Sequence, residues 1–288
     1  MEFEDFIRTA WAEHADQPDD VAERLALSLD RVELPAHVAP FAGIVTHVFG
    51  EHLARFDDGV ELLESVRRLP ACNGQAEALG VLTRSVAALR YASGEDHALD
   101  VLAPQDRISA LANASGAILG RLDFGRAIVA YDEALRLAIK HGPEARAQRS
   151  LAVAGNNLAS TLEQKADRSA SETEGMLRAA EAALKYWAQA GTWLETERAE
   201  YRLTRSLLQA GQPVVATLHA QRCLAVCAAN DAPAFERFFG EAVLAIAQRG
   251  AGDEPAFVKS RERALALFAQ VPDEEQQWCA PELKELHA

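Results

Sequence analysis

The sequence predicts an all-α protein built from consecutive antiparallel helix pairs. Apolar residues recur at spacings of three and four along almost the whole chain, and strict alternation over four or more residues is hard to find. Alanine and leucine dominate, and β-branched residues come singly rather than in runs. Glycine and proline interrupt this pattern at quasi-regular intervals, which leave room for helices of about four or five turns.

The helix boundaries follow from these breakers and from the acidic residues after them. Acids cluster in QPDDVAERL, SGEDHAL, GDEPAF and VPDEEQQW, where carboxylates face the positive end of a helix dipole. The predicted pairs are 2–15 with 18–32, 38–54 with 57–69, 75–92 with 95–103, 106–121 with 124–140, 144–164 with 173–190, 192–210 with 213–229, and 233–249 with 254–270. A final helix at 273–286 covers the end.

The composition limits the class of protein. The chain has 288 residues, of which 49% are hydrophobic and 25% charged, so it can form a sizeable core and is too apolar for general disorder. Its formal net charge of −14 disfavours general binding to nucleic acid or to an anionic membrane. The longest mostly apolar stretch, VAPFAGIVTHVFG, is too short to span a bilayer.

Targeting and cysteine usage predict a cytoplasmic location. The first residues, MEFEDFIRTAW, are acidic and amphipathic, with neither the basic nor the apolar region of a signal peptide. Four cysteines in a chain of this length do not make a disulfide framework. We interpret Cys223 and Cys227, which stand four apart, as neighbouring small apolar side chains on one helix.

Residues 122–138, LDFGRAIVAYDEALRLA, show how the predicted helices pack. Ala127, Tyr131 and Ala134 share one stripe of a helix. A small–large–small order lets a neighbouring helix approach closely at the alanines while the tyrosine fills the gap between pairs. Just upstream, LANASGAILG places the small residues Ala112 and Ser115, and then Ile118, on the facing helix.

Residues 111–138 together resemble one unit of the tetratricopeptide repeat (TPR) family, which has two antiparallel helices, a tight turn and an aromatic before a small residue. Weaker copies are FGEHLARFDDGVELLESVRRLP, SVAALRYASGEDHALDVL, NNLASTLEQ with MLRAAEAALKYW, and YRLTRSLLQAGQPVVATLHAQRCLAVC. The resemblance implies a right-handed superhelical solenoid of about seven hairpins. It implies one TPR-like domain over 1–288, with an atypical hairpin at 1–35, repeats over 36–270 and a capping helix over 271–288.

The chain departs from the family in three ways. The successive small residues are unevenly spaced against a period of ~34 residues: Gly59, Ala98, Ala127, Ala180 and Ala216. The polar stretch KADRSASETEG (165–175) is an added loop, and His47 stands where the first repeat would have a small residue. A helical bundle without repeats is the alternative fold.

Catalytic and metal-binding motifs are scarce. The chain contains no G-x-S-x-G, no glycine-rich phosphate loop and no H-E-x-x-H. His47 and His52 are five apart and are expected on different faces, and His47 with Glu51 alone does not make a metal site. The histidines isolated in sequence are His14, His97, His141 and His219. The sequence therefore predicts no enzyme, no cofactor and no metal.

The resemblance points to a concave face, formed by the first helix of each pair, as the site that receives peptides or partner helices. In some TPR families a ladder of asparagines on this face holds the ligand backbone. Here asparagine recurs two residues before the small residue at Asn113 and Asn157. Arg84 takes that place one repeat earlier and Arg202 one repeat later. An amide can donate and accept hydrogen bonds, although exposure to water alone would also explain these asparagines.

A basic stripe strengthens this interpretation. It comprises Arg198, Arg202 and Arg205, with Tyr201 alongside. Of the three arginines, only Arg198 has an acid at helical pairing distance, Glu195. In a protein of net charge −14, such a stripe predicts a receptor for an anionic ligand. Acids on a neighbouring helix, Glu181 for instance, are the competing partners.

The leading functional hypothesis is a scaffold that binds a protein or peptide partner, acidic or with a free C-terminal carboxylate. The predicted ligand-binding residues are Arg84, Asn113, Asn157, Arg198, Tyr201, Arg202 and Arg205. A ligand-sensing regulatory protein is one alternative. A self-associating structural subunit, a homodimer for example, is another, joined by exposed apolar residues such as Trp11, Phe257 and Trp278, which would equally close the ends of the solenoid.

Overall fold

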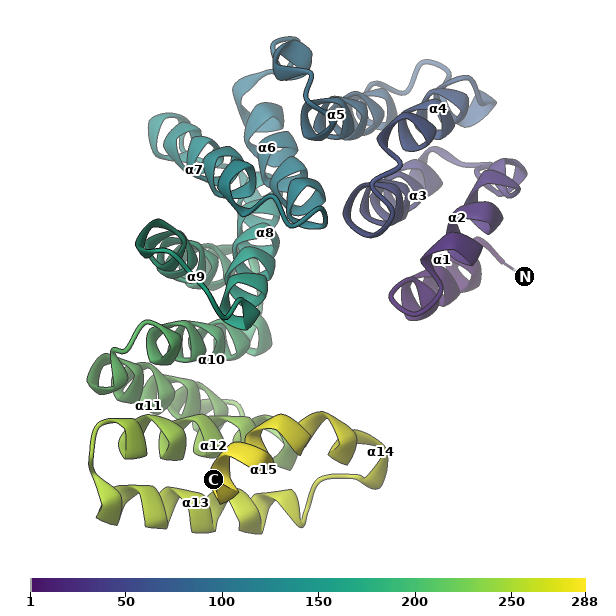
Figure 1. The fold of residues 1–288 in the computed structure, drawn as a ribbon. Helices are drawn as coiled ribbons and strands as arrows, with labels where there is room; N and C mark the ends of the chain where they lie inside the picture. The colour runs from purple at the N-terminus through teal and green to yellow at the C-terminus, as the bar shows by residue number, and fades with distance from the viewer. Residues whose placement is uncertain (1) are drawn as a thin grey trace. The chain divides into compact units, whose positions relative to one another are not determined.

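The computed structural model describes residues 2–288 and confirms the all-α prediction, because no β-strand forms among these residues. The chain divides into two compact units, residues 1–154 and 155–288, called here the N-terminal and C-terminal units. Within each unit, helices adjacent in sequence pack against each other, as α6 does with α7 and α12 with α13 (Figure 1). This succession of packed helix pairs is the arrangement that the sequence predicts.

The N-terminal unit begins with short helices and continues with longer ones. Its elements are α1 (Phe3–Glu13), α2 (Pro18–Ala26), η1 (Leu29–Arg31), α3 (Pro35–Val45), η2 (Thr46–His52), α4 (Phe56–Arg67), η3 (Pro70–Cys72), α5 (Ala76–Ser93), η4 (Asp96–Leu99), α6 (Pro104–Leu119), α7 (Phe124–His141) and the first part of α8 (Ala145–Gln164). The segment η2 is a π-helix that continues α3, whereas η1, η3 and η4 are short 3₁₀ turns.

The C-terminal unit contains long helix pairs and a broken final segment. Its elements are the remainder of α8, then α9 (Ala170–Ala190), α10 (Trp193–Gln209), α11 (Pro213–Ala229), α12 (Ala234–Gly250), α13 (Glu254–Phe268), α14 (Asp273–Gln276), η5 (Gln277–Cys279) and α15 (Ala280–His287). None of the helices in the described residues is both long enough and apolar enough to cross a membrane.

The repeat-like unit at 111–138 packs as its sequence predicts. Ala127, Tyr131 and Ala134 are all buried on α7, and the facing α6 contributes the buried Ser115. The Ser115 hydroxyl donates to the backbone carbonyl of Ala127 at 2.9 Å, which is compatible only with close approach of the two helices. The Tyr131 hydroxyl donates to the carbonyl of Leu151 at 2.8 Å and so links α7 to α8.

Several expected boundaries differ from the structure. The helix expected at 18–32, for example, ends at Ala26 and is followed by the turn η1. The expected helix at 95–103 is only the turn η4, because Gly94 in a left-handed conformation (φ 116°) and Pro104 leave little room between α5 and α6. The expected loop at 165–175 is shorter, because Ser169 caps α9 in a reciprocal capping box with Glu172. The expected helix at 273–286 is broken into α14, η5 and α15.

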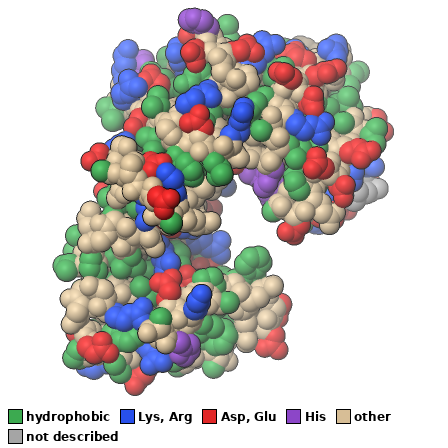
Figure 2. Space-filling model, viewed as in Figure 1, with side chains coloured by type: hydrophobic (Ala, Val, Ile, Leu, Met, Phe, Trp, Pro, Cys, Tyr) green, Lys and Arg blue, Asp and Glu red, His purple; other side chains and the backbone are tan. Residues whose placement is uncertain are grey.

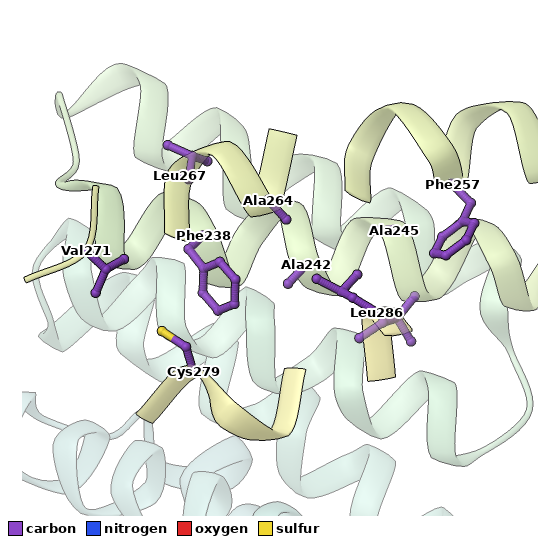
Figure 3. Packing of buried hydrophobic residues seen from close by; sticks show 10 residues of the cluster. Phe238, Ala242, Ala245, Phe257, Ala264, Leu267, Val271, Cys279 and Leu286 are labelled. Atoms are coloured by element: carbon purple, nitrogen blue, oxygen red, sulfur yellow. The ribbon is translucent and has the colours of Figure 1, made fainter. Parts of the chain in front are cut away.

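The core at the end of the chain lies between α12, α13 and the final segment. Figure 3 shows Phe238 and Ala242 of α12 packed with Leu267 and with Cys279 and Leu286 of the final segment. These side chains are buried, so the final segment covers part of α12.

One expected exposed residue is buried in this core. Phe257 is 8% exposed, and the guanidinium of Arg249 lies 5.2 Å from its ring centroid, so the expectation that Phe257 is free for self-association is wrong. Its position on the inward stripe of α13 explains the difference. Trp11 and Trp278 are exposed, at 41% and 66%.

Candidate functional site

The C-terminal unit carries a groove of about 590 Å³ between α10, α12 and the final segment, called here the aromatic groove. It is lined by Asn156, Glu197, Arg198, Tyr201, Arg202, Phe235, Glu236, Phe239, Trp278, Pro281 and Glu282. Four of these residues are aromatic, and they come from three separate segments of the chain. A concave surface with several aromatic side chains and a few polar groups is typical of ligand sites.

The aromatic side chains pack edge to face. The Phe235 and Phe239 ring centroids are 5.0 Å apart, and those of Tyr201 and Phe239 are 5.6 Å apart, with steep interplanar angles of 72° and 83°. Trp278 remains 66% exposed beside them. An apolar side chain of a ligand that entered the groove would therefore contact ring surfaces on more than one side.

Each arginine of the predicted basic stripe pairs with a carboxylate from another helix. The nitrogen–oxygen distances are 2.6 Å for Arg198 with Glu236 of α12, 2.5 Å for Arg202 with Glu163 of α8, and 2.7 Å for Arg205 with Glu285 of α15. The competing partners are thus acids on neighbouring helices, but not Glu181, which is exposed on α9. In the view of Figure 2, acidic and basic side chains lie next to one another over each unit.

The three arginines differ in how far they reach solvent. The Arg198 side chain is 57% exposed, against 23% for Arg202 and 17% for Arg205. Arg198 turns Nη2 and Nε toward Glu236, at 2.6 and 3.4 Å, and this hydrogen bonding raises the pKa of its guanidinium despite partial burial. Arg205 does not line the groove.

Two of the carboxylates that line the groove are held by hydrogen bonds. The Tyr201 hydroxyl donates to Glu282, and burial together with the Glu282 charge raises the pKa of Tyr201 well above its ordinary value. Glu197 is 1% exposed, and Cys223 Sγ donates to its Oε1 at 2.9 Å. Burial is the largest cause that raises the pKa of Glu197 to about 7. The hydrogen bond from Cys223 lowers this pKa, and the charge of Glu236 raises it.

The remaining predicted residues do not line the aromatic groove. Asn157 is half-buried on α8, where its carbonyl accepts from the Thr161 hydroxyl, and the preceding Asn156 lines the groove instead. Arg84 and Asn113 belong to the N-terminal unit. Arg84 donates to Asp106 at 2.9 Å and is 11% exposed, whereas Asn113 is exposed on α6.

The structure thus brings Arg198, Tyr201 and Arg202 into one groove and adds residues that the sequence interpretation missed. The most important additions are Phe235, Phe239 and Trp278. The spacing of four between Phe235 and Phe239 in AFERFFGEA was a usable signal, because it places both rings on one face of a helix.

A second group of polar residues lies in the N-terminal unit, where His14, His47 and His52 lie together. His47 Nε2 and His52 Nε2 are 3.2 Å apart, so the expectation that these rings point to different faces is wrong. The reason is that residues 46–52 form a π-helix, in which hydrogen bonds run from i to i+5 and residues five apart lie above one another. Burial, followed by the neighbouring His47 and His14, lowers the pKa of His52.

Comparisons with known proteins identify no family for this chain. The sequence matches no protein-family model and no curated protein sequence. Two similar solved structures are those of TPR-like repeats, described as nearly identical, from a kinesin light chain of Podosopora anserina and from a single-substitution variant of it. Identities are 16% and 15%, coverage is 76% and 75% of this chain and 97% and 95% of those chains, and both TM-scores are 0.48.

Proposed function

We propose that this chain is a protein-interaction scaffold whose C-terminal unit binds an extended peptide segment of a partner protein in the aromatic groove. The observation that carries the proposal is the concave lining of Tyr201, Phe235, Phe239 and Trp278, with Trp278 two-thirds exposed. Stacked helix pairs commonly present such surfaces to partners. The proposal includes no catalytic step.

The lining favours a segment that combines an apolar side chain with a carboxylate. The apolar side chain would pack against Phe239 and Trp278, as aromatic anchors do at protein interfaces. The carboxylate, from an acidic residue or a free C-terminus, would accept hydrogen bonds from the outer edge of Arg198, which remains exposed beside Glu236. Asn156 offers an amide to the peptide backbone.

Charge alone does not explain recognition at this groove. Each of the three stripe arginines already pairs with a carboxylate of the same unit, namely Glu236, Glu163 or Glu285, and Tyr201 donates to a fourth, Glu282. We therefore assign the carboxylate contact to Arg198. Arg202 and Arg205 act as positioning residues that tie α10 to α8 and α15.

The test is a selection from a library of peptides with free carboxyl termini, using the full-length chain, followed by fluorescence anisotropy with the selected peptides. Trp278→Ala should weaken binding by about 30-fold, as loss of an aromatic anchor does. Arg198→Ala should weaken it by about tenfold. Trp11→Ala and Arg136→Ala are matched controls, because both residues are exposed and lie in the N-terminal unit.

Three results would contradict the proposal. One is a library that yields no peptide bound more tightly than a scrambled sequence. Another is a selected peptide whose affinity is unchanged by Trp278→Ala and by Phe239→Ala. A third is an equal loss in the Trp11→Ala control. Circular dichroism of each variant establishes that it remains folded.

Self-association stays a separate prediction, to which exposed Trp278 is relevant because the same ring could contact a second copy. Light scattering across a dilution series distinguishes the two uses. A mass that rises with concentration in the wild type and not in Trp278→Ala would indicate self-association. The ligand-sensing function and the cytoplasmic location also remain predictions.

A further inference from the structure

Three histidines from two distant segments converge at the surface of the N-terminal unit and form what is called here the histidine cluster: His14, His47 and His52. His14 follows directly after α1, and the other two stand near the ends of the π-helix η2. The ring centroids form a nearly equilateral triangle with sides of 4.8, 4.8 and 5.0 Å. The ring planes are steeply inclined to each other, at 58°, 76° and 90°, so the rings are not stacked.

Hydrogen bonds fix which ring nitrogens are available. His14 Nδ1 lies 2.7 Å from the carbonyl oxygen of Trp11, which can only accept, so Nδ1 carries the proton and Nε2 has the free lone pair. His47 Nδ1 lies 3.1 Å from a carboxylate oxygen of Glu51 and likewise acts as the donor. Both rings therefore present Nε2 as a ligand atom. A carboxylate behind a ligating imidazole is a recurrent feature of metal sites.

The separations suit a bound metal ion. One nitrogen from each ring lies within 4.8 Å of the others. Two imidazole nitrogens on a tetrahedral Zn²⁺, each 2.0–2.1 Å from the metal, are ~3.3 Å apart. His47 Nε2 and His52 Nε2 are already 3.2 Å apart. A hydrogen bond would account for this one pair, whereas the equal spacing of all three rings suits a shared cation.

The backbone around η2 is built to hold Glu51 and its neighbours in place. A Cβ added to Gly120 of the α6 C-terminus would lie 1.9 Å from the Glu51 carbonyl oxygen. A Cβ added to Gly116 would lie 2.8 Å from Glu51 Oε1. Only glycine at these positions allows η2 to approach α6 so closely. The π-helix is then what brings His52 over His47.

We propose that the histidine cluster is a binding site for a divalent transition-metal ion, with Zn²⁺ as the ion best suited to it. His14 Nε2, His47 Nε2 and one nitrogen of His52 are the ligands, and Glu51 is a positioning residue for His47. Three imidazoles leave one tetrahedral position for water. His52 is exposed and His14 and His47 are partly exposed, so an ion can enter from solvent. The bound ion joins the end of α1 to η2.

The experiment is a titration of the full-length, metal-stripped chain with Zn²⁺ by isothermal calorimetry and with Co²⁺ by visible absorption. We expect one ion per chain and the intense absorption of tetrahedral Co²⁺. His14→Gln and His52→Gln should each weaken Zn²⁺ binding by more than 100-fold, and Glu51→Gln by about 10–100-fold. His97→Gln is the matched control, because His97 is almost fully exposed and lies outside the cluster. Circular dichroism without metal establishes that each variant is folded.

The titrations distinguish a specific metal site from its absence. Stoichiometric binding that is lost in both ligand variants and kept in His97→Gln supports the site. Equal Zn²⁺ affinity in the wild type and in a His14→Gln/His52→Gln double variant overturns it. Binding by the wild type with the spectrum of octahedral Co²⁺ overturns the proposed tetrahedral coordination. An independent readout uses thermal unfolding, since Zn²⁺ should raise the midpoint of the wild type and not that of the double variant.

Discussion

Glu197 provides a direct test of the electrostatics of the aromatic groove. Its carboxyl is 1% exposed, accepts a hydrogen bond from Cys223 at 2.9 Å and lies near the carboxylate of Glu236. Burial is the largest cause that raises its pKa from 4.5 to about 7. The substitution Glu197→Gln keeps the size and the acceptor oxygen but removes the ionisation. It should therefore change how stability depends on pH more than it changes the fold.

The direction in which the free energy of unfolding changes with pH follows from proton binding by Glu197. Between pH 4.5 and about 7 the folded state keeps the Glu197 proton while the unfolded state has lost it. The free energy of unfolding therefore falls as pH rises through this window and levels off above it. The difference between the two pKa values corresponds to about 3 kcal/mol at 1.36 kcal/mol per unit. Glu197→Gln should remove this loss, so the variant gains about 3 kcal/mol relative to the wild type between pH 4.5 and pH 8.

The assay is urea unfolding followed by circular dichroism at half-unit steps from pH 4.5 to pH 8.5, under reducing conditions. Titrating groups that do not interact with Glu197, the histidines included, contribute equally to both proteins and cancel in the difference. Glu262→Gln is the control, because Glu262 is exposed on α13 and should give a difference that does not vary with pH. A Glu197→Gln difference that is constant across the range would refute the argument from burial.

Two further predictions concern packing in the N-terminal unit. Tyr131→Phe removes a buried hydrogen bond to a backbone carbonyl and should lower the free energy of unfolding by about 1 kcal/mol in urea titrations, with no change in helical content; an unchanged midpoint would contradict this. Gly120→Ala places a Cβ 1.9 Å from the Glu51 carbonyl oxygen, so it should lower the free energy of unfolding by more than the usual cost of overpacking, about 1–3 kcal/mol. The control is Gly125→Ala, which should be tolerated because the nearest atom to its Cβ would be 3.9 Å away. Equal thermal midpoints for the two variants would refute the close approach of η2 to α6.

The sequence predicted the helices well because its periodicity and capping residues are local. The stripe of Ala127, Tyr131 and Ala134 identified both the buried face of α7 and the close approach of α6. Local rules failed where geometry depends on a neighbouring element. The spacing of residues in the π-helix η2 does not distinguish it from an α-helix. His47 and His52 were therefore expected on different faces, whereas the π-helix brings their rings together.

The candidate site was predictable only in part, for the same reason. Helical spacing placed Arg198, Tyr201 and Arg202 on related positions of α10, and the structure puts them in one groove. Their acidic partners were not predictable, because Glu236 lies 38 residues from Arg198 and Glu163 lies 39 residues from Arg202. Pairs across that distance in sequence depend on which helices become neighbours. The local sequence pattern does not show which helices will be neighbours.

The internal pairing of the arginines changes how recognition should be understood. An unpaired basic stripe would attract any anion, and its affinity would fall steeply with salt. Here the acidic partners of Arg202 and Arg205 already neutralise those side chains, which are less than a quarter exposed. The chain's charge of −14 further disfavours indiscriminate anion capture. Selectivity would then depend on the fit of an apolar side chain against Phe239 and Trp278, with Arg198 fixing the orientation of the bound segment.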